Sequence, residues 1–196
     1  MGGRIVLAVG IALISVMLLT RSWAGEGGKR AATLGERTDG MKLETATFAA
    51  GCFWHVEDTF RTVEGVVSTE VGFEGGHFDK PTYRDVCTDR TGHAESVKIT
   101  FDPAKVSYRK LLETFFQLHD PTTVDRQGPD VGTQYRSVIF YATPEQKEQA
   151  IAYRAELDKS GRYRRPIATE IAPVSTFWKA EEYHQQYYEK ERGETR

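Results

Sequence analysis

The chain has 196 residues, a formal net charge of -2, 39% apolar side chains and 28% charged side chains. These values are typical of a soluble globular domain that is large enough to bury a core. Acidic and basic residues are mixed along the chain rather than grouped in blocks, and the net charge gives no basic footprint of the kind that binds nucleic acid. The sequence contains no internal repeat and no low-complexity tract.

The N-terminal segment, residues 1–24, differs from the rest of the chain. Arg4 precedes an almost unbroken apolar run over 5–19, and small residues follow at Ser22 and Ala24. This order predicts a secretory signal peptide that is cleaved after Ala24, and therefore an exported, periplasmic or secreted protein. The alternative is an uncleaved, outward-facing membrane anchor, although the run is shorter than the roughly 20 residues that a spanning helix needs.

Residues 25–40 (GEGGKRAATLGERTDG) are polar and Gly-rich, which predicts a flexible linker, and residues 41–196 are then the folded domain. The two cysteines of the chain, Cys52 and Cys87, both lie in this domain. In an exported protein, two cysteines suggest a structural disulfide by default. A domain of this length does not need one for stability, and the surroundings of Cys52 favour another use.

The predicted elements follow from hydrophobic periodicity. Strands are expected over 44–50, 66–73, 94–101, 136–142 and 167–174, and helices over 52–63, 106–119, 144–160 and from about 180. Long polar loops are expected between the second and third strands and over 120–133; loops of this length are often functional. Two successive strands without an intervening helix predict an α+β two-layer sandwich with a ferredoxin-like split β-α-β core.

Cys52 is predicted at a strand-to-helix junction, after Gly51 and next to Phe53 and Trp54. Free backbone N–H groups and the helix dipole favour a negative charge at this position. The junction therefore predicts a stabilised thiolate, which is the nucleophilic form of cysteine. A buried and inert cysteine with aromatic core neighbours is the alternative.

Glu95 stands where the first long loop enters an otherwise apolar strand. The carboxyl group either faces solvent or lies in a pocket, where burial would raise its pKa and keep it protonated as an acid. Tyr83, Asp130 and Tyr135 lie in the two long loops, and each one alone is weak support for a site.

Five motifs together carry a specific resemblance. GCFW (51–54), GGHFDKPTYRDVC (75–87), GHAE (92–95), DVGTQYRS (130–137) and AEEYHQQY (180–187) resemble the A-type peptide methionine sulfoxide reductases in order and spacing. The resemblance covers residues 42–188 and implies reduction of the S epimer of methionine sulfoxide, free and in oxidised proteins. It implies no cofactor beyond an external thiol such as thioredoxin or a thioredoxin-like donor, and no metal. We expect a monomer, because no large apolar stripe is left over.

The resemblance also implies a role for each residue of the motifs. Cys52 attacks the sulfoxide sulfur and Glu95 protonates the oxygen. Four other side chains bind the substrate: Phe53 and Trp54 hold its methyl group, and Tyr83 and Tyr135 hydrogen-bond its oxygen. Asp130 helps to orient it. Attack leaves Cys52 as a sulfenic acid.

The C-terminal tail departs from the commonest pattern of the family, because residues 183–196 contain no resolving cysteine. Two routes of regeneration remain open: direct reduction of Cys52 by an external thiol, which we favour, or a disulfide with Cys87 as resolving thiol if its loop moves. A static disulfide between Cys52 and Cys87 would abolish activity.

Three other functions compete with this hypothesis. A thiol peroxidase also forms a cysteine sulfenic acid, but it does not require aromatic side chains beside the thiol. A structural zinc site would use the C-x-x-H spacing of Cys52 and His55, for which no second ligand pair is evident. A binding module would use the aromatic tail as a peptide groove and would not need the thiol.

Overall fold

The computed structural model describes residues 1–2 and 42–193 of the chain. Apart from its first two residues, the predicted signal peptide lies outside the described residues, as does the predicted linker. None of the helices in the described part is long and apolar enough to cross a lipid bilayer.

One mixed sheet organises residues 42–193. Its strands lie in the order β7-β6-β1-β3-β2-β8, and all neighbours are antiparallel except β6 and β7. The bounds are β1 (Glu44–Ala50), β2 (Val66–Glu74), β3 (Ala94–Phe101), β6 (Ser137–Tyr141), β7 (Glu170–Pro173) and β8 (Trp178–Lys179).

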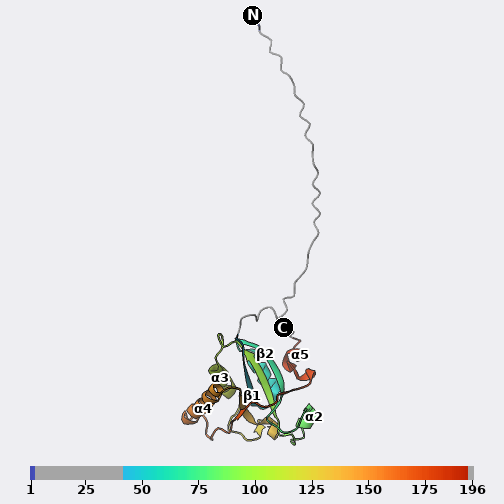
Figure 1. The fold of residues 1–196 in the computed structure, drawn as a ribbon, viewed down its shortest axis with the longest axis vertical. Coiled ribbons are helices and arrows are strands. Elements are labelled where there is room, and N and C mark those ends of the chain that lie inside the picture. Colours follow the sequence, from blue (N-terminus) through green and yellow to red (C-terminus); the bar gives the residue numbers. More distant parts are fainter. Residues whose placement is uncertain (3–41, 194–196) are drawn as a thin grey trace. The chain divides into compact units, whose positions relative to one another are not determined.

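Three helices of at least two turns accompany the sheet: α1 (Phe53–Arg61), α3 (Tyr108–Leu118) and α4 (Pro144–Lys159). Ser107 and Thr143 cap α3 and α4, since their hydroxyl oxygens accept hydrogen bonds from backbone N–H groups of the first turn. Figure 1 shows α3 and α4 together beside the sheet, with α2 (Tyr83–Val86) and α5 (Tyr187–Glu191) on the other side of the view.

The connectivity β1-α1-β2 followed by β3-α3-β6, with the inner order β6-β1-β3-β2, is the split β-α-β arrangement. The predicted α+β two-layer fold with a ferredoxin-like core is therefore confirmed. Strands β7 and β8 extend this four-stranded centre at its two edges.

Side-chain alternation assigns each strand residue to one face of the sheet. On β3, Val97, Ile99 and Phe101 belong to the main core under the helices. Glu95 continues the same alternation, so its carboxyl group is on the α1 face. Ala94 belongs to a smaller cluster on the opposite face.

Several elements differ from the predictions. The first long loop contains the short helix α2, and the second contains a small hairpin of β4 (Arg126–Gln127) and β5 (Asp130–Val131). The last predicted strand is shorter, because only Glu170–Pro173 pair with β6.

The predicted tail helix from about residue 180 is wrong in its extent. A 3-10 turn, η3 (Glu182–His184), precedes the single short helix α5. The reason is that the Gln185 side chain bonds to Val71 N and O and to Ala180 O, at 2.9 Å each, and holds this segment against the edge of β2.

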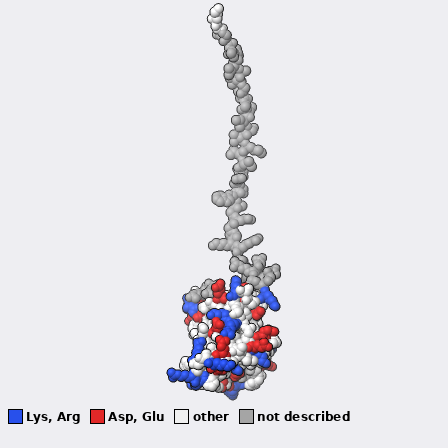
Figure 2. Space-filling view, turned by 90° about the vertical axis from the view of Figure 1, so that its left-hand side faces the viewer, with Lys and Arg blue, Asp and Glu red and all other residues white. Residues whose placement is uncertain are grey.

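Charged side chains of both signs are interspersed over the face of the described domain shown in Figure 2. This agrees with the mixed charge pattern of the sequence and with its small net charge.

Candidate active site

The site is built on the junction between β1 and α1. Gly51 has a φ of +92°, which favours glycine, and a Cβ atom there would lie 2.8 Å from the Gln127 side chain. Cys52 is the N-cap residue of α1, and the helix begins at Phe53. The thiol therefore lies beside the free N–H groups of the first helical turn, as predicted.

Glu95 reaches the same helix end from β3. Its residue is 2% exposed, and its Oε2 accepts a hydrogen bond of 3.1 Å from the backbone N–H of Phe53. Its backbone pairs with Phe73 on β2. The carboxyl group is thus buried next to Cys52, although the two residues are 43 positions apart in the chain.

Burial raises the pKa of Glu95 to about 8, the Phe53 N–H opposes this shift, and the charge of Asp130 adds to it. Glu95 is therefore mostly protonated at pH 7, which is the state that a general acid requires. The alternation of Val97, Ile99 and Phe101 is the sequence signal that places Glu95 on the buried face.

The thiol is in the opposite state to the one predicted. The pKa of Cys52 is raised to about 11, first by burial and then by the neighbouring charge of Glu95. Hydrogen bonds from the backbone N–H groups of Trp54 and His55 lower the pKa, as predicted for a helix N-terminus, but they do not outweigh burial. The expectation of a preformed thiolate is wrong for the substrate-free site, in which Cys52 is a neutral thiol.

Two tyrosines approach the site from the long loops. Tyr83 begins α2, and Thr82 and Asp85 hold that turn in a reciprocal capping box. Tyr135 ends the 3-10 turn η2 (Thr133–Tyr135), and its pKa is raised to about 12 by burial and then by the charges of Glu95 and Asp130. Burial makes the largest contribution to the raised pKa of Tyr83, and a side-chain hydrogen bond with Cys87 raises it further. Both phenols are therefore hydrogen-bond donors at neutral pH.

Asp130 lies on β5 and is partly exposed. Its charge contributes to the raised pKa values of Cys52, Glu95 and Tyr135, so it lies close to all three. The structure thus brings together the seven residues for which a role in chemistry or substrate binding was predicted: Cys52, Phe53, Trp54, Tyr83, Glu95, Asp130 and Tyr135.

Aromatic rings form one wall of the site. Phe53 is almost completely buried and packs against Phe73 and Tyr83, with ring centroids 5.8 and 6.2 Å apart. Trp54 is partly buried and stacks on Tyr187 at 3.9 Å. Trp54 is therefore the more accessible of the two rings beside Cys52.

His184 and Tyr187 belong to this wall, and sequence reasoning assigned neither of them a role. The Trp54 indole N–H donates to His184 Nδ1 at 3.1 Å, and the imidazole packs on Tyr83 with a centroid distance of 4.4 Å. Burial lowers the pKa of His184, so the ring is neutral and can accept this hydrogen bond. The motif AEEYHQQY contained both residues but gave no contact for either.

Buried polar contacts fix the tail on α1. Glu57 accepts hydrogen bonds from the backbone N and side-chain Nε2 of Gln186, at 2.7 and 3.0 Å, and from Thr69 at 2.8 Å. Arg61 binds both carboxylate oxygens of Glu189, at 2.7 and 2.8 Å. These contacts hold the tail where Tyr187 can stack on Trp54.

Cys87 is the C-cap of α2 and is exposed. Both cysteines are free thiols, so no disulfide joins them in the structure. Cys87 lies near Tyr83 and Tyr135, since it contributes to the pKa shift of each phenol. The described residues contain no group of three or more His, Cys, Asp or Glu side chains that could hold a metal ion.

A thiol and a neutral buried carboxylic acid at one helix end, with phenols and an aromatic wall, define a thiol-dependent oxidoreductase site. The family model for peptide methionine sulfoxide reductase matches residues 44–196. The MsrA protein of Methanoculleus marisnigri is 64% identical over 151 residues, which are 77% of this chain and 92% of that protein.

Solved structures agree with the sequence comparison. Methionine sulfoxide reductase A of Corynebacterium diphtheriae has a TM-score of 0.69 at 41% identity, over 76% of each chain. Reduced Mxr1 from Saccharomyces cerevisiae has a TM-score of 0.72 at 35% identity, over 76% of this chain and 86% of that one. The chain belongs to the peptide methionine sulfoxide reductases of the MsrA type, which are oxidoreductases.

Proposed function

We propose that the protein reduces the S epimer of methionine sulfoxide through Cys52 and Glu95. The observation that carries this proposal is the buried, protonated Glu95 beside the Cys52 thiol at the N-terminus of α1. A sulfoxide oxygen is a poor leaving group until it is protonated, so the nucleophile needs an acid within reach of the same substrate.

The first half of the reaction begins with two neutral groups. Glu95 gives its proton to the sulfoxide oxygen, and the Cys52 proton replaces it on the carboxylate as the thiol sulfur attacks. A bond forms between Cys52 Sγ and the substrate sulfur. That bond then breaks as the oxygen moves to Cys52, which releases methionine and leaves a sulfenic acid. The substrate sulfur gains two electrons and the Cys52 sulfur loses two.

The other residues position the substrate. Phe53 and Trp54 provide the apolar surface for its methyl group, while Tyr83 and Tyr135 donate hydrogen bonds to its oxygen. Asp130 supports its orientation. A methyl site on one side of the sulfur and oxygen donors on another distinguish the two configurations, which supports selection of a single epimer.

Regeneration requires two thiol equivalents: Cys52 sulfenic acid and two thiols give the Cys52 thiol, a disulfide and water. We propose a thioredoxin-like donor that attacks Cys52 directly, because residues 183–196 contain no cysteine. Yeast Mxr1 has been solved in complex with Trx2. Cys87 is exposed on α2 and is not needed in this route.

A single turnover without reductant tests this scheme. The protein, which starts with two free thiols, is expected to release one methionine per chain and to retain one thiol. The oxidised sulfur should react with dimedone at Cys52, as located by mass spectrometry. Loss of both thiols with formation of a Cys52–Cys87 disulfide would show instead that Cys87 resolves the sulfenic acid. Absence of methionine would contradict the whole scheme.

We also propose that the enzyme repairs oxidised proteins outside the cytoplasm. The support is the order of charge, apolar run and small residues in the first 24 residues. N-terminal sequencing of protein recovered from the exported fraction of the producing cell should begin at Gly25. An intact Met1 on protein that stays in the cytoplasm would overturn this location.

A further inference from the structure

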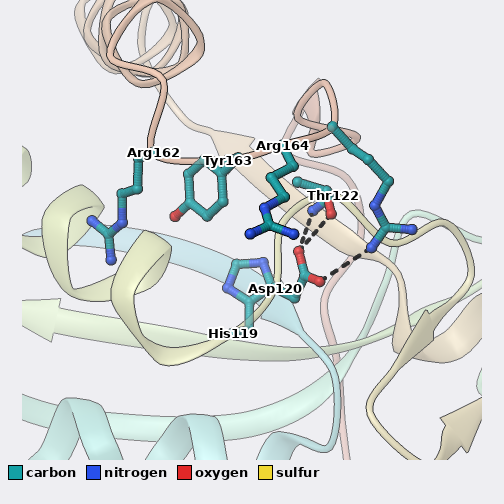
Figure 3. Close-up of a pocket in the computed structure, with 7 residues that line it drawn as sticks. His119, Asp120, Thr122, Arg162, Tyr163 and Arg164 are labelled. Atoms are coloured by element: carbon teal, nitrogen blue, oxygen red, sulfur yellow. Dashed lines mark hydrogen bonds and ion pairs between the residues drawn. The ribbon is translucent and has the colours of Figure 1, made fainter.

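A pocket that contains none of the residues of the Cys52 site lies between the end of α3 and the segment that follows α4. Figure 3 shows it, and its volume is about 410 Å³. Its lining is rich in arginine and consists of His119, Asp120, Thr122, Arg162, Tyr163, Arg164 and Arg165. The positive charge of this lining contrasts with the net charge of -2 of the whole chain.

Most of the positive charge in this pocket is not neutralised by the protein. Arg162 and Arg164 have no carboxylate partner among the described residues, whereas Arg165 meets Asp120 at 3.4 Å. In Figure 3 the guanidinium group of Arg164 projects between Tyr163 and Asp120 without a hydrogen bond to either. Asp120 is also occupied by Thr122, whose N–H and hydroxyl donate at 3.0 and 2.7 Å.

Partly buried hydrogen bonds hold the pocket in shape. The Tyr163 hydroxyl donates to the Phe116 carbonyl at 2.8 Å, which fixes the residue between the two unpaired arginines. His119 bonds to Phe115 O and Ser137 Oγ, at 2.8 and 2.7 Å. Burial lowers the pKa of His119 to about 4, so it adds no charge at neutral pH.

A smaller pocket, of about 340 Å³, adjoins the first one. It shares Asp120 and Arg165 with the first pocket and adds Arg126 and Gln127. The Gln127 side chain also lies against Gly51, the residue before Cys52. The Gln127 side chain therefore lies between this smaller pocket and the residue that precedes the nucleophile. Across the two pockets, four arginines stand against one aspartate: Arg126, Arg162, Arg164, Arg165 and Asp120.

We infer that this surface, made of Arg126, Arg162, Arg164 and Arg165, binds acidic residues that flank the oxidised methionine of a protein substrate. The inference rests on the proposed function and specifies its substrate class. A guanidinium group can bind a carboxylate through two parallel N–H···O hydrogen bonds in one plane. Methionine sulfoxide carries no charge, so a preference among protein substrates must come from contacts outside the Cys52 site. Three residues of an extended peptide span about 10 Å, so flanking side chains contact the protein surface outside the Cys52 site.

The test compares two peptides, each with one S-epimer methionine sulfoxide. The first carries Glu at the three positions on each side, and the second carries Gln at the same positions. We expect kcat/KM to be about threefold to tenfold higher for the Glu peptide at low salt, mainly through KM. The difference should disappear in 0.5 M NaCl, which screens exposed charge pairs.

The double variant Arg162→Ser/Arg164→Ser should lose this preference but reduce free methionine sulfoxide at the wild-type rate. A matched control, Lys110→Ser/Lys147→Ser, removes the same charge from the first turns of α3 and α4, at the far ends of these helices from the pocket. It should retain the preference. Equal kcat/KM for the two peptides with the wild-type protein, or a preference that survives in the arginine variant, would overturn the inference. Failure to reduce free methionine sulfoxide would instead refute the proposed function.

Discussion

Replacing Cys52 with Ser is expected to lower turnover of methionine sulfoxide by at least about 10³-fold. A serine hydroxyl at the same N-cap position can neither attack the sulfoxide sulfur at a useful rate nor carry its oxygen as a sulfenic acid. The measurement is methionine release with dithiothreitol as reductant, with circular dichroism to verify the fold.

Cys87→Ser is the matched control for this variant, because it removes the other thiol of the chain from an exposed position. It should retain turnover with dithiothreitol within about twofold. Substantial turnover by Cys52→Ser, or loss of turnover in Cys87→Ser, would show that Cys52 is not the nucleophile.

Replacing Glu95 with Gln is expected to lower the single-turnover rate by about 10²- to 10⁴-fold at pH 7, the usual contribution of a general acid. The Gln side chain can still accept the hydrogen bond from Phe53 N–H, so the change removes the proton rather than the contact. In the wild-type protein the rate should fall as the pH rises through about 8, because Glu95 then ionises. Ionised Glu95 also holds the pKa of Cys52 higher, which works in the same direction.

The Glu95→Gln variant should not show this fall in rate as the pH rises through about 8. Glu74→Gln is the matched control, since Glu74 is also buried, accepts a hydrogen bond from Ser175 N and has a pKa raised to about 7 by burial. In the pairing of β2 with β3, Glu74 lies opposite Ala94, so its side chain is on the other face of the sheet from Glu95. An alkaline decline that persists in Glu95→Gln, or that disappears in Glu74→Gln, would remove the acid role from Glu95.

Much of the fold was predictable because its determinants are local. Alternation at Val97, Ile99 and Phe101 marks β3 and its buried face, and apolar spacing in α1 marks the helix that follows Cys52. The resemblance carried by the five motifs then implied that the chemistry of the site lies near this junction. The tail was not predictable in the same way, because its course depends on Gln185 and Val71, which are far apart in the sequence.

The protonation state of Cys52 shows why the rest required the structure. A helix N-terminus is visible in sequence, and it does lower the pKa of the thiol through Trp54 and His55. Burial depth and the distance to Glu95 are not visible, and these two effects are larger. The arginine pocket is similar, since Arg162 and Arg164 line one pocket with Asp120 and Thr122, which are about 40 positions away in the sequence.

The most direct test of the account is turnover of the separate S and R epimers of free methionine sulfoxide by the purified protein with dithiothreitol. The predicted result is conversion of the S epimer to methionine while the R epimer remains unchanged. Reduction of both epimers at similar rates would contradict the arrangement of methyl surface and oxygen donors around Cys52. Reduction of neither by the folded, reduced protein would contradict the reductase itself.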